Sequence, residues 1–189
     1  MSSHHIVREK QEPALLILSL DDFDEEQLGQ LLEWSPTVIT TPITAELLDA
    51  IGIKVDVVMA DELEEILQSD IKLVPTDGRA TAKAAMHYLL SNGYPAVNII
   101  TDEVDIETFA AFATQINIVV FSGNRKIFAI NSGFSKWKPA GERMEILSEA
   151  SDLMVAGAQP IGERRYLTQH DGFVTFTFNS PYLFIAEEI

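Results

Sequence analysis

Acidic and hydroxyl side chains follow each of the apolar segments in the first half of the sequence. Carboxylates bind Mg²⁺, and the N–H groups at helix N-termini bind phosphate oxygens. The residues of these types are Asp21, Asp22 and Asp24; Thr41; Asp61 and Glu62; Thr76 and Asp77; and Thr101, Asp102 and Asp105. If the apolar segments are parallel strands, these groups gather at the carboxyl ends of the strands, where open α/β sheets bind ligands. The spacing therefore indicates a site for a magnesium–nucleotide complex.

The same residue types have a second interpretation, which stays open. Asp and Thr are preferred N-caps, so each of them could simply begin a helix after a strand. Carboxylates that converge on one point would favour a metal site. Carboxylates that each accept hydrogen bonds from their own helix would favour capping.

The elements that position these groups alternate regularly over the first 113 residues. Short apolar runs predict strands at 14–20, 37–40, 55–59, 71–74 and 97–100. Helices are expected to begin at Asp24, Pro42, Asp61 and Arg79, with a last helical stripe over 106–113. Strands separated by single helices build a parallel sheet with right-handed crossovers.

For two of these helices, the sequence predicts which residues face the core. Apolar residues at helical spacing predict that Leu47, Leu48 and Ile51 face the core. A short helix that starts at Asp61 is expected to use one apolar face, formed by Leu63, Ile66 and Leu67.

The pattern changes to strands after residue 117. Segments 118–121 and 125–130 are expected to form a hairpin around Gly123. Further short strands are predicted at 143–147, 153–156, 172–178 and 182–185. The predicted fold class is therefore α/β. A Rossmann-like, three-layer α/β/α domain with a mainly parallel sheet spans 1–121, and a small, sandwich-like all-β domain spans 122–189.

Composition excludes several function classes. The net charge of −16 repels a phosphate backbone, so nucleic acid is not an expected partner. No apolar run is long enough to span a bilayer, and no segment has the character of a signal peptide. Cysteine is absent, which excludes disulfides and thiolate metal sites. We expect a cytoplasmic protein. The phosphate-binding motifs G-x-x-x-x-G-K-[ST] and G-x-G-x-x-G are also absent.

The order of features from Val38 to Ile66 resembles the thiamine pyrophosphokinase family. The run 38–42, Val-Ile-Thr-Thr-Pro, leads into a helix, and Gly52-Ile53-Lys54-Val55-Asp56 resembles the family's G-I-x-P-D. Lys83-Ala84 is similar to the end of its T-D-x-x-K-A helix, and a small β domain follows in both. The resemblance covers most of the chain in layout and is specific over about 30 residues.

The family's pattern implies roles for particular residues of this chain. Asp61 and Asp77 would be catalytic, and Thr41, Asp102 and Asp105 would bind the nucleotide or thiamine. Asp61, Asp77 and Asp105 would hold Mg²⁺. The resemblance also implies a homodimer, with ATP and a thiamine-like alcohol as small-molecule partners.

The departures from the family's pattern lie at these same positions. The family's D-G-A/G turn is Thr-Pro-Ile at 41–43, and its G-D-x-D-S is Ala-Asp-Glu-Leu-Glu at 60–64, which lacks the second Asp. The acidic residue of T-D-x-x-K-A falls on Ala80, with Asp77 about one turn earlier. The G-G-R-x-D-H loop is replaced by residues 101–105, without Gly, Arg or His. Phosphoryl transfer needs positioning and neutralisation of a polyanion, so these losses should be severe.

Three hypotheses follow. The first is a thiamine pyrophosphokinase-like protein with lost or weakened catalysis that keeps a small-molecule or nucleotide cleft. The second is an active enzyme that transfers a diphosphoryl group from ATP to thiamine or a related alcohol, with Mg²⁺ as cofactor. The third is an unrelated α/β scaffold or interaction protein whose acids are caps. We favour the first, and the sequence leaves enzymatic activity undecided.

Overall fold

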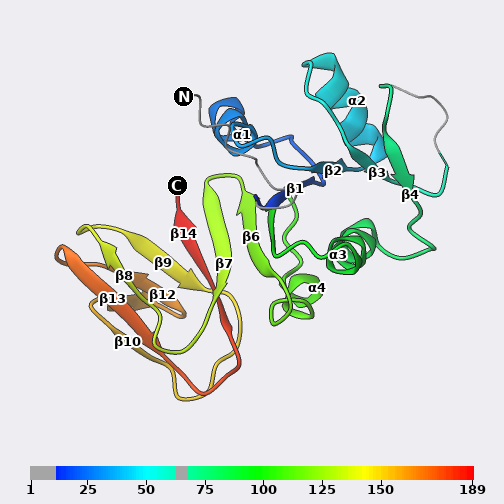
Figure 1. Ribbon diagram of the computed structural model, residues 1–189. Helices are drawn as coiled ribbons and strands as arrows, with labels where there is room; N and C mark the ends of the chain where they lie inside the picture. Colours follow the sequence, from blue (N-terminus) through cyan, green and yellow to red (C-terminus); the bar gives the residue numbers. More distant parts are fainter. Residues whose placement is uncertain (1–11, 63–67) are drawn as a thin grey trace, which may run out of the picture. The chain divides into compact units, whose positions relative to one another are not determined.

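A computed structural model describes residues 12–62 and 68–189 (Figure 1). The chain forms two compact units, which divide after Asp102. The domain boundary predicted after Phe121 falls inside the second unit, near the end of a strand. None of the described helices has the length and apolar character needed to cross a membrane.

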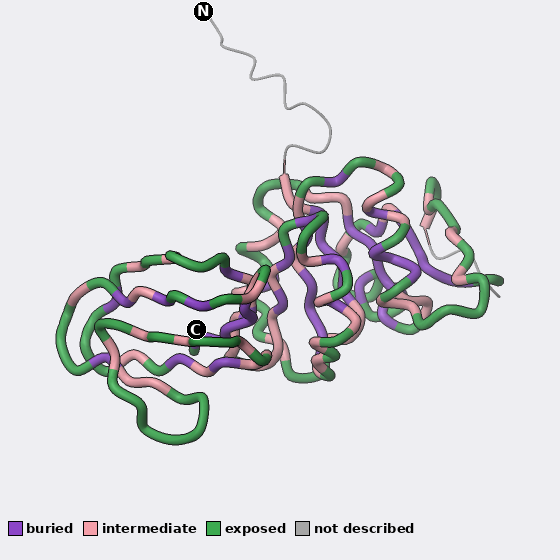
Figure 2. Tube along the Cα trace, turned by 90° about the horizontal axis from the view of Figure 1, so that it is seen from below, coloured by how far each residue is buried: buried purple, intermediate pink, exposed green. Residues whose placement is uncertain are grey.

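The described strands of the first unit form a parallel array. They are β1 (Ala14–Ile17), β2 (Val38–Thr40), β3 (Val57–Met59), β4 (Lys72–Val74) and β5 (Ala96–Ile100). Their order is β5-β1-β2-β3-β4, and every pairing between them is parallel. All four residues of β1 are at most 1% exposed, so its side chains are buried on both faces of the sheet, which explains its continuous apolar run. Long purple stretches mark such buried strands in Figure 2.

Side-chain caps begin two of the three helices described in the first unit. The helices are α1 (Glu25–Leu32), α2 (Pro42–Ala50) and α3 (Thr81–Ser91). Asp24 caps α1 by accepting from the N–H groups of Glu26 and Gln27. Thr41 caps α2, with Pro42 in the first turn as predicted. No side chain caps α3.

The predicted core face of α2 is wrong for two of its three residues. Leu48 is fully buried, but Leu47 is 48% and Ile51 is 58% exposed. The helix instead buries Thr44 and Ala45 with Leu48. Small residues at 44 and 45 let the helix turn that face inward, which rotates the larger Leu47 and Ile51 toward solvent. The helix predicted around Leu63, Ile66 and Leu67 lies outside the described residues.

The second unit is built almost entirely from antiparallel strands after one short helix, α4 (Ile106–Ala110). The strands are β6 (Asn117–Ser122), β7 (Arg125–Ile130), β8 (Ser135–Lys138), β9 (Arg143–Ile146), β10 (Met154–Ala156), β11 (Gln159–Gly162), β12 (Arg165–Leu167), β13 (Gly172–Thr177) and β14 (Leu183–Glu188). One sheet has the order β11-β12-β9-β14-β7-β6, and the smaller sheet has the order β10-β13-β8. The protein as a whole is a mixed α/β fold rich in strands.

Residues from both sheets share one hydrophobic core in this unit. Met144, Ile146 and Ile185 come from the larger sheet, and Val174 and Phe176 from the smaller one. On β13, the buried Val174 and Phe176 alternate with residues that are at least partly exposed, whereas β14 is buried at five of its six positions. This alternation explains why β13 was predicted correctly from its pattern of apolar residues and threonines.

Three strands were not predicted, and each has a physical reason. β8 contains Lys136 and Lys138, which are inward-facing because both pair with Glu187. β11 and β12 are short, and β11 is exposed along its whole length. The β11–β12 pairing is also irregular between Pro160 and Gly162. Such segments lack the apolar alternation that indicates a strand.

The backbone of Gly157 lies against β13 where the chain leaves β10. Its φ is +85°, and a Cβ built there would lie 2.1 Å from the backbone oxygen of Phe173. Both the conformation and the close approach require a residue without a side chain.

Candidate functional site

The parallel strands bring four of the five predicted site residues to one edge of the first unit. The registers align Ile17 of β1 with Thr40 of β2 and Ile100 of β5, so the strands end at a common level. Four site residues follow the ends of these strands within three residues: Thr41, Asp61, Asp77 and Asp102. Asp105 lies in the second unit.

Asp61 and Asp77 are neighbours at this edge. The carboxylate of Asp61 accepts from the backbone N–H of Thr76 (2.8 Å), the hydroxyl of Thr76 (2.8 Å) and the backbone N–H of Asp77 (3.1 Å). A left-handed conformation at Asp77, with φ of +53°, is part of the turn that presents these donors. The Asp77 carboxylate lies 3.6 Å from Nη2 of Arg79, in an exposed ion pair. Asp61 therefore joins the end of β3 to the turn after β4.

Asp102 joins two other strand ends in a similar way. Its carboxylate accepts from the N–H groups of Asp21 and Asp22, both at 3.3 Å. Its own N–H donates to the hydroxyl of Ser19 at 2.8 Å. Asp102 thus links the end of β5 to the segment after β1. Sequence reasoning missed the part played by Ser19, although it was the one polar residue in an apolar run.

Thr41 and Asp105 act as helix caps. The Thr41 hydroxyl accepts from the N–H of Thr44 (3.2 Å) and donates to the hydroxyl of the same residue (3.0 Å). Asp105 accepts from the N–H (3.0 Å) and hydroxyl (2.7 Å) of Thr108 at the start of α4. These contacts are the ones that the capping interpretation requires.

Within residues 12–62 and 68–189, no three acidic or histidine side chains are grouped in a way that could hold a metal ion. Of the predicted ligands, Asp61 and Asp77 are in direct contact, through the backbone N–H of Asp77 and the Asp61 carboxylate. A divalent cation prefers several oxygen ligands, so this pair alone is a poor match for a protein-bound Mg²⁺. Substrate phosphates and water would have to supply the remaining ligands.

Hydrogen bonds lower the pKa of two of these carboxyl groups. The Thr76 hydroxyl has the largest effect on the pKa of Asp61, followed by the N–H of Asp77. The Thr108 hydroxyl, followed by the Thr108 N–H, lowers the pKa of Asp105. Both groups therefore keep their charge to a lower pH than an ordinary aspartate.

The lowered pKa of Asp61 predicts a specific pH dependence of stability. Because its folded-state pKa lies below the unfolded-state value of about 4, its ionised form stabilises the fold at neutral pH. That contribution is lost as the pH falls from about 4 through the lowered folded-state pKa. Asp61→Asn keeps an acceptor for the turn but does not titrate. Urea unfolding at several acidic pH values should give a smaller loss of stability for this variant than for the wild type. Equal losses would contradict the prediction.

The sequence matches no protein-family model and no curated protein. Solved structures with similar folds do exist. The thiamine pyrophosphokinase from Bacillus subtilis has a TM-score of 0.69 at 12% identity, covering 94% of this chain and 99% of that one. The corresponding protein from Geobacillus thermodenitrificans has a TM-score of 0.67 at 11% identity, with coverage of 93% and 97%. Yeast thiamin pyrophosphokinase has a TM-score of 0.62 at 9% identity, with coverage of 97% and 88%. The resemblance inferred from the sequence is thus confirmed at the level of the fold.

Proposed function

We propose that this protein, with its thiamine pyrophosphokinase-like fold, has lost catalytic activity or retains only weak activity. It keeps a cleft for a nucleotide or another small molecule. The cleft would lie at the carboxyl ends of the first unit's strands. The observation that carries the proposal is the bonding of Asp61. Its carboxylate accepts three hydrogen bonds from the Thr76–Asp77 turn.

These bonds give Asp61 a role in holding the fold. A carboxylate that binds Mg²⁺ directs oxygen lone pairs at the ion, whereas here both oxygens accept from one turn. The transferred group in phosphoryl transfer is a polyanion that metal ions and cations must neutralise. At this edge the described cation nearest to the pair is Arg79, which is exposed and contacts Asp77 at 3.6 Å. Bond geometry and charge therefore both favour weak catalysis.

An active enzyme is the second candidate, and the adjacency of Asp61 and Asp77 favours it. In that case Asp61 and Asp77, with Asp105, would hold Mg²⁺, and Thr41 and Asp102 would contact the nucleotide. Bound Mg²⁺ would neutralise the phosphates of ATP during transfer of a diphosphoryl group to thiamine or a related alcohol. The protein's own groups would then orient the metal–nucleotide complex.

Several finer features belong to the same proposal. They are a Rossmann-like, three-layer arrangement of helices around the parallel sheet, a homodimer and a cytoplasmic location. Domains at 1–121 and 122–189 would correspond to a catalytic-like part and a thiamine-binding-like part. The similarity in fold to thiamine pyrophosphokinases over nearly the whole chain supports them.

The decisive experiment measures AMP and thiamine diphosphate after incubation with Mg²⁺, ATP and thiamine. The Bacillus subtilis thiamine pyrophosphokinase serves as the positive control in the same assay. We expect a rate at least about 100-fold below the control, because charge neutralisation of the transferred group is weakened. A rate within about tenfold of the control, abolished by Asp61→Asn, would establish the second candidate instead.

A thermal-shift measurement with Mg-ATP tests the cleft itself. A nucleotide that binds only the folded state raises the melting temperature. The shift should be lost in Asp61→Ala, which removes the acceptor that holds the Thr76–Asp77 turn at this edge. It should be kept in Asp24→Asn, which removes a charge from the same unit while leaving a good N-cap. Absence of any shift with Mg-ATP or thiamine in the wild type would contradict the cleft.

A further inference from the structure

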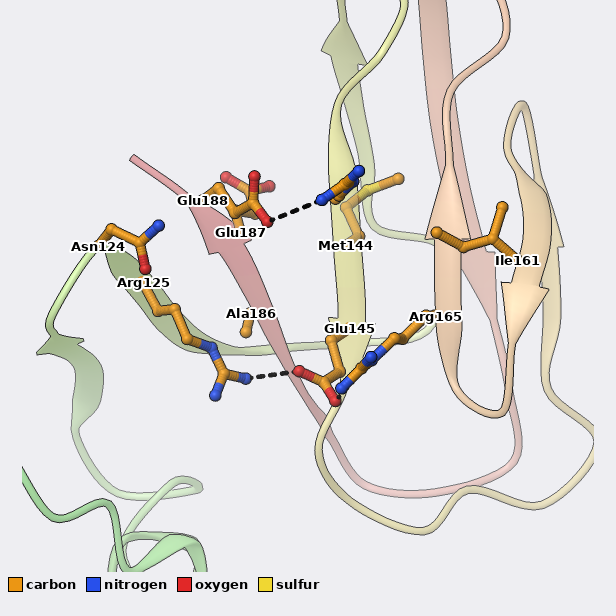
Figure 3. Close-up of a pocket in the computed structure, with 10 residues that line it drawn as sticks. Asn124, Arg125, Met144, Glu145, Ile161, Arg165, Ala186, Glu187 and Glu188 are labelled. Atoms are coloured by element: carbon orange, nitrogen blue, oxygen red, sulfur yellow. Dashed lines mark hydrogen bonds and ion pairs between the residues drawn. The ribbon is translucent and has the colours of Figure 1, made fainter.

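A hollow of about 440 Å³ lies on the outward face of the larger sheet in the second unit (Figure 3). Three arginines from three strands line it: Arg125 of β7, Arg143 of β9 and Arg165 of β12. These are three of the 13 lysines and arginines of the whole chain. Such a concentration of guanidinium groups in a protein of net charge −16 needs a physical explanation.

The pairing register places these groups on one face. Glu188 pairs with Arg125, while Ala186 pairs with Glu145, which in turn pairs with Arg165. Directly opposed residues of antiparallel strands point to the same side of a sheet. Met144, between Arg143 and Glu145, is buried in the core on the other side. The arginines therefore face away from the core.

Ala186 gives the hollow its depth. It lies on β14 between the strands that carry Arg125 and Glu145, and its methyl side chain leaves space above the sheet. Across this space Nη2 of Arg125 reaches Oε2 of Glu145 at 2.8 Å, and Figure 3 shows the contact as a dashed line. A larger residue at 186 would fill the floor.

Glu145 holds two guanidinium groups in place without using up their donors. Its other oxygen accepts from Nε of Arg165 at 3.3 Å. A guanidinium has five N–H donors, so most donors of both arginines remain for a further acceptor. Arg143 is held more loosely, since its Nη1 lies 3.9 Å from Oε1 of Glu188. The guanidinium groups of Arg125 and Arg165 are thus held by hydrogen bonds, and that of Arg143 by a longer ion pair, at the same hollow.

The charges in the hollow leave an excess of one cation. Three arginines face Glu145 and Glu188, while the carboxylate of Glu187 lies on the other face of β14, bonded to Lys136 and Lys138. A local positive field in a strongly acidic chain concentrates an anion that the rest of the surface repels. Arginine forks match phosphate oxygens in geometry as well as in charge.

We propose that this hollow binds a small organic molecule bearing a phosphate or diphosphate group. The phosphate would accept from Arg125, Arg143 and Arg165, and the organic part would lie on Ala186 and Ile161. The volume lies within the range of small-molecule sites. This site belongs to the second unit and is independent of the strand-end site described above.

Calorimetric titration with pyrophosphate, and with succinate as a carboxylate probe of different geometry, tests the proposal. We expect pyrophosphate to bind and succinate to bind at least about tenfold more weakly. Pyrophosphate has more negative charge and more acceptor oxygens for three guanidinium groups, whereas each succinate carboxylate offers only two oxygens. Arg125→Gln and Arg165→Gln should each raise the Kd for pyrophosphate about tenfold or more. Equal affinity for the two probes, or no binding of pyrophosphate, would overturn it.

Two further variants separate binding from loss of structure. Arg143→Gln removes only the 3.9 Å ion pair, so it should fold normally and still weaken binding. Glu188→Gln removes a carboxylate that repels the ligand, so it should tighten binding. Arg164→Gln is the matched control, because Arg164 precedes Arg165 but pairs with Glu149 outside the hollow. A loss of affinity in Arg164→Gln equal to that in Arg165→Gln would contradict a specific site.

Discussion

Replacing Gly157 with alanine should lower the free energy of unfolding by more than about 3 kcal/mol. Two costs act together at this position. The added methyl would stand 2.1 Å from the backbone oxygen of Phe173, where no flexible side chain can move aside. The φ of +85° also disfavours any residue with a Cβ. Relief would require β10 and β13 to separate, and they form two of the three strands of the smaller sheet. Urea unfolding of the purified variant measures the effect.

Gly141 provides a matched control for this prediction. Its φ is +89°, but a Cβ built there meets no atom within 4 Å. Gly141→Ala should therefore show the conformational cost alone, about 1–2 kcal/mol. If the free energy of unfolding falls by the same amount in both variants, the close approach at Gly157 does not contribute to the loss and the prediction is wrong.

The second large effect is expected at Glu187. Its carboxylate is 5% exposed and accepts from Nζ of Lys136 (2.7 Å) and Nζ of Lys138 (3.0 Å). Lys138 is itself 9% exposed on its side chain, so it cannot find water without a rearrangement. Glu187→Ala should cost about 3 kcal/mol, because it leaves the buried ammonium of Lys138 with only the longer, 3.6 Å contact to Glu142. Chemical unfolding at neutral pH measures the loss.

Two variants identify the cause of that loss. Glu188→Ala, at the next position, removes a carboxylate that is 55% exposed and should cost less than about 0.5 kcal/mol. The double variant Glu187→Leu with Lys138→Met replaces the buried pair with apolar groups and should recover most of the stability. A double variant less stable than Glu187→Ala would show that packing around β14, and not an isolated charge, controls this region.

The elements of the first unit were the most predictable part of the fold. The run from Ala14 onward was correctly assigned to a buried strand, because burial of both faces leaves no polar face on β1. Asp24 and Thr41 were correctly assigned as N-caps, since capping depends on neighbours within four residues. The inward face of α2 was predicted wrongly, because the choice between Leu47 and Ala45 depends on the surface opposite the helix.

The candidate sites show the same division between local and long-range information. Parallel topology predicts that the strand-end groups lie along one edge of the sheet, and it leaves open which of them are in contact. The donors that occupy Asp61 come from the turn in which Asp77 and Gly78 both have positive φ. The Asp-Gly pair favours such a turn, but the carboxylate that accepts from it depends on the fold. The arginine hollow was not predicted at all. It depends on the register of β7, β14, β9 and β12, which lie up to 63 residues apart in sequence (Arg125 to Glu188).

The irregular β11 has a consequence for how the protein behaves at high concentration. β11 is the outermost strand of the larger sheet, and an outermost strand exposes backbone groups that can recruit a strand from another molecule. Pro160 has no N–H to offer, and the shift in pairing between Pro160 and Gly162 disrupts the even spacing that a recruited strand would need. The features that concealed this strand from pattern analysis thus protect the sheet against edge-to-edge aggregation.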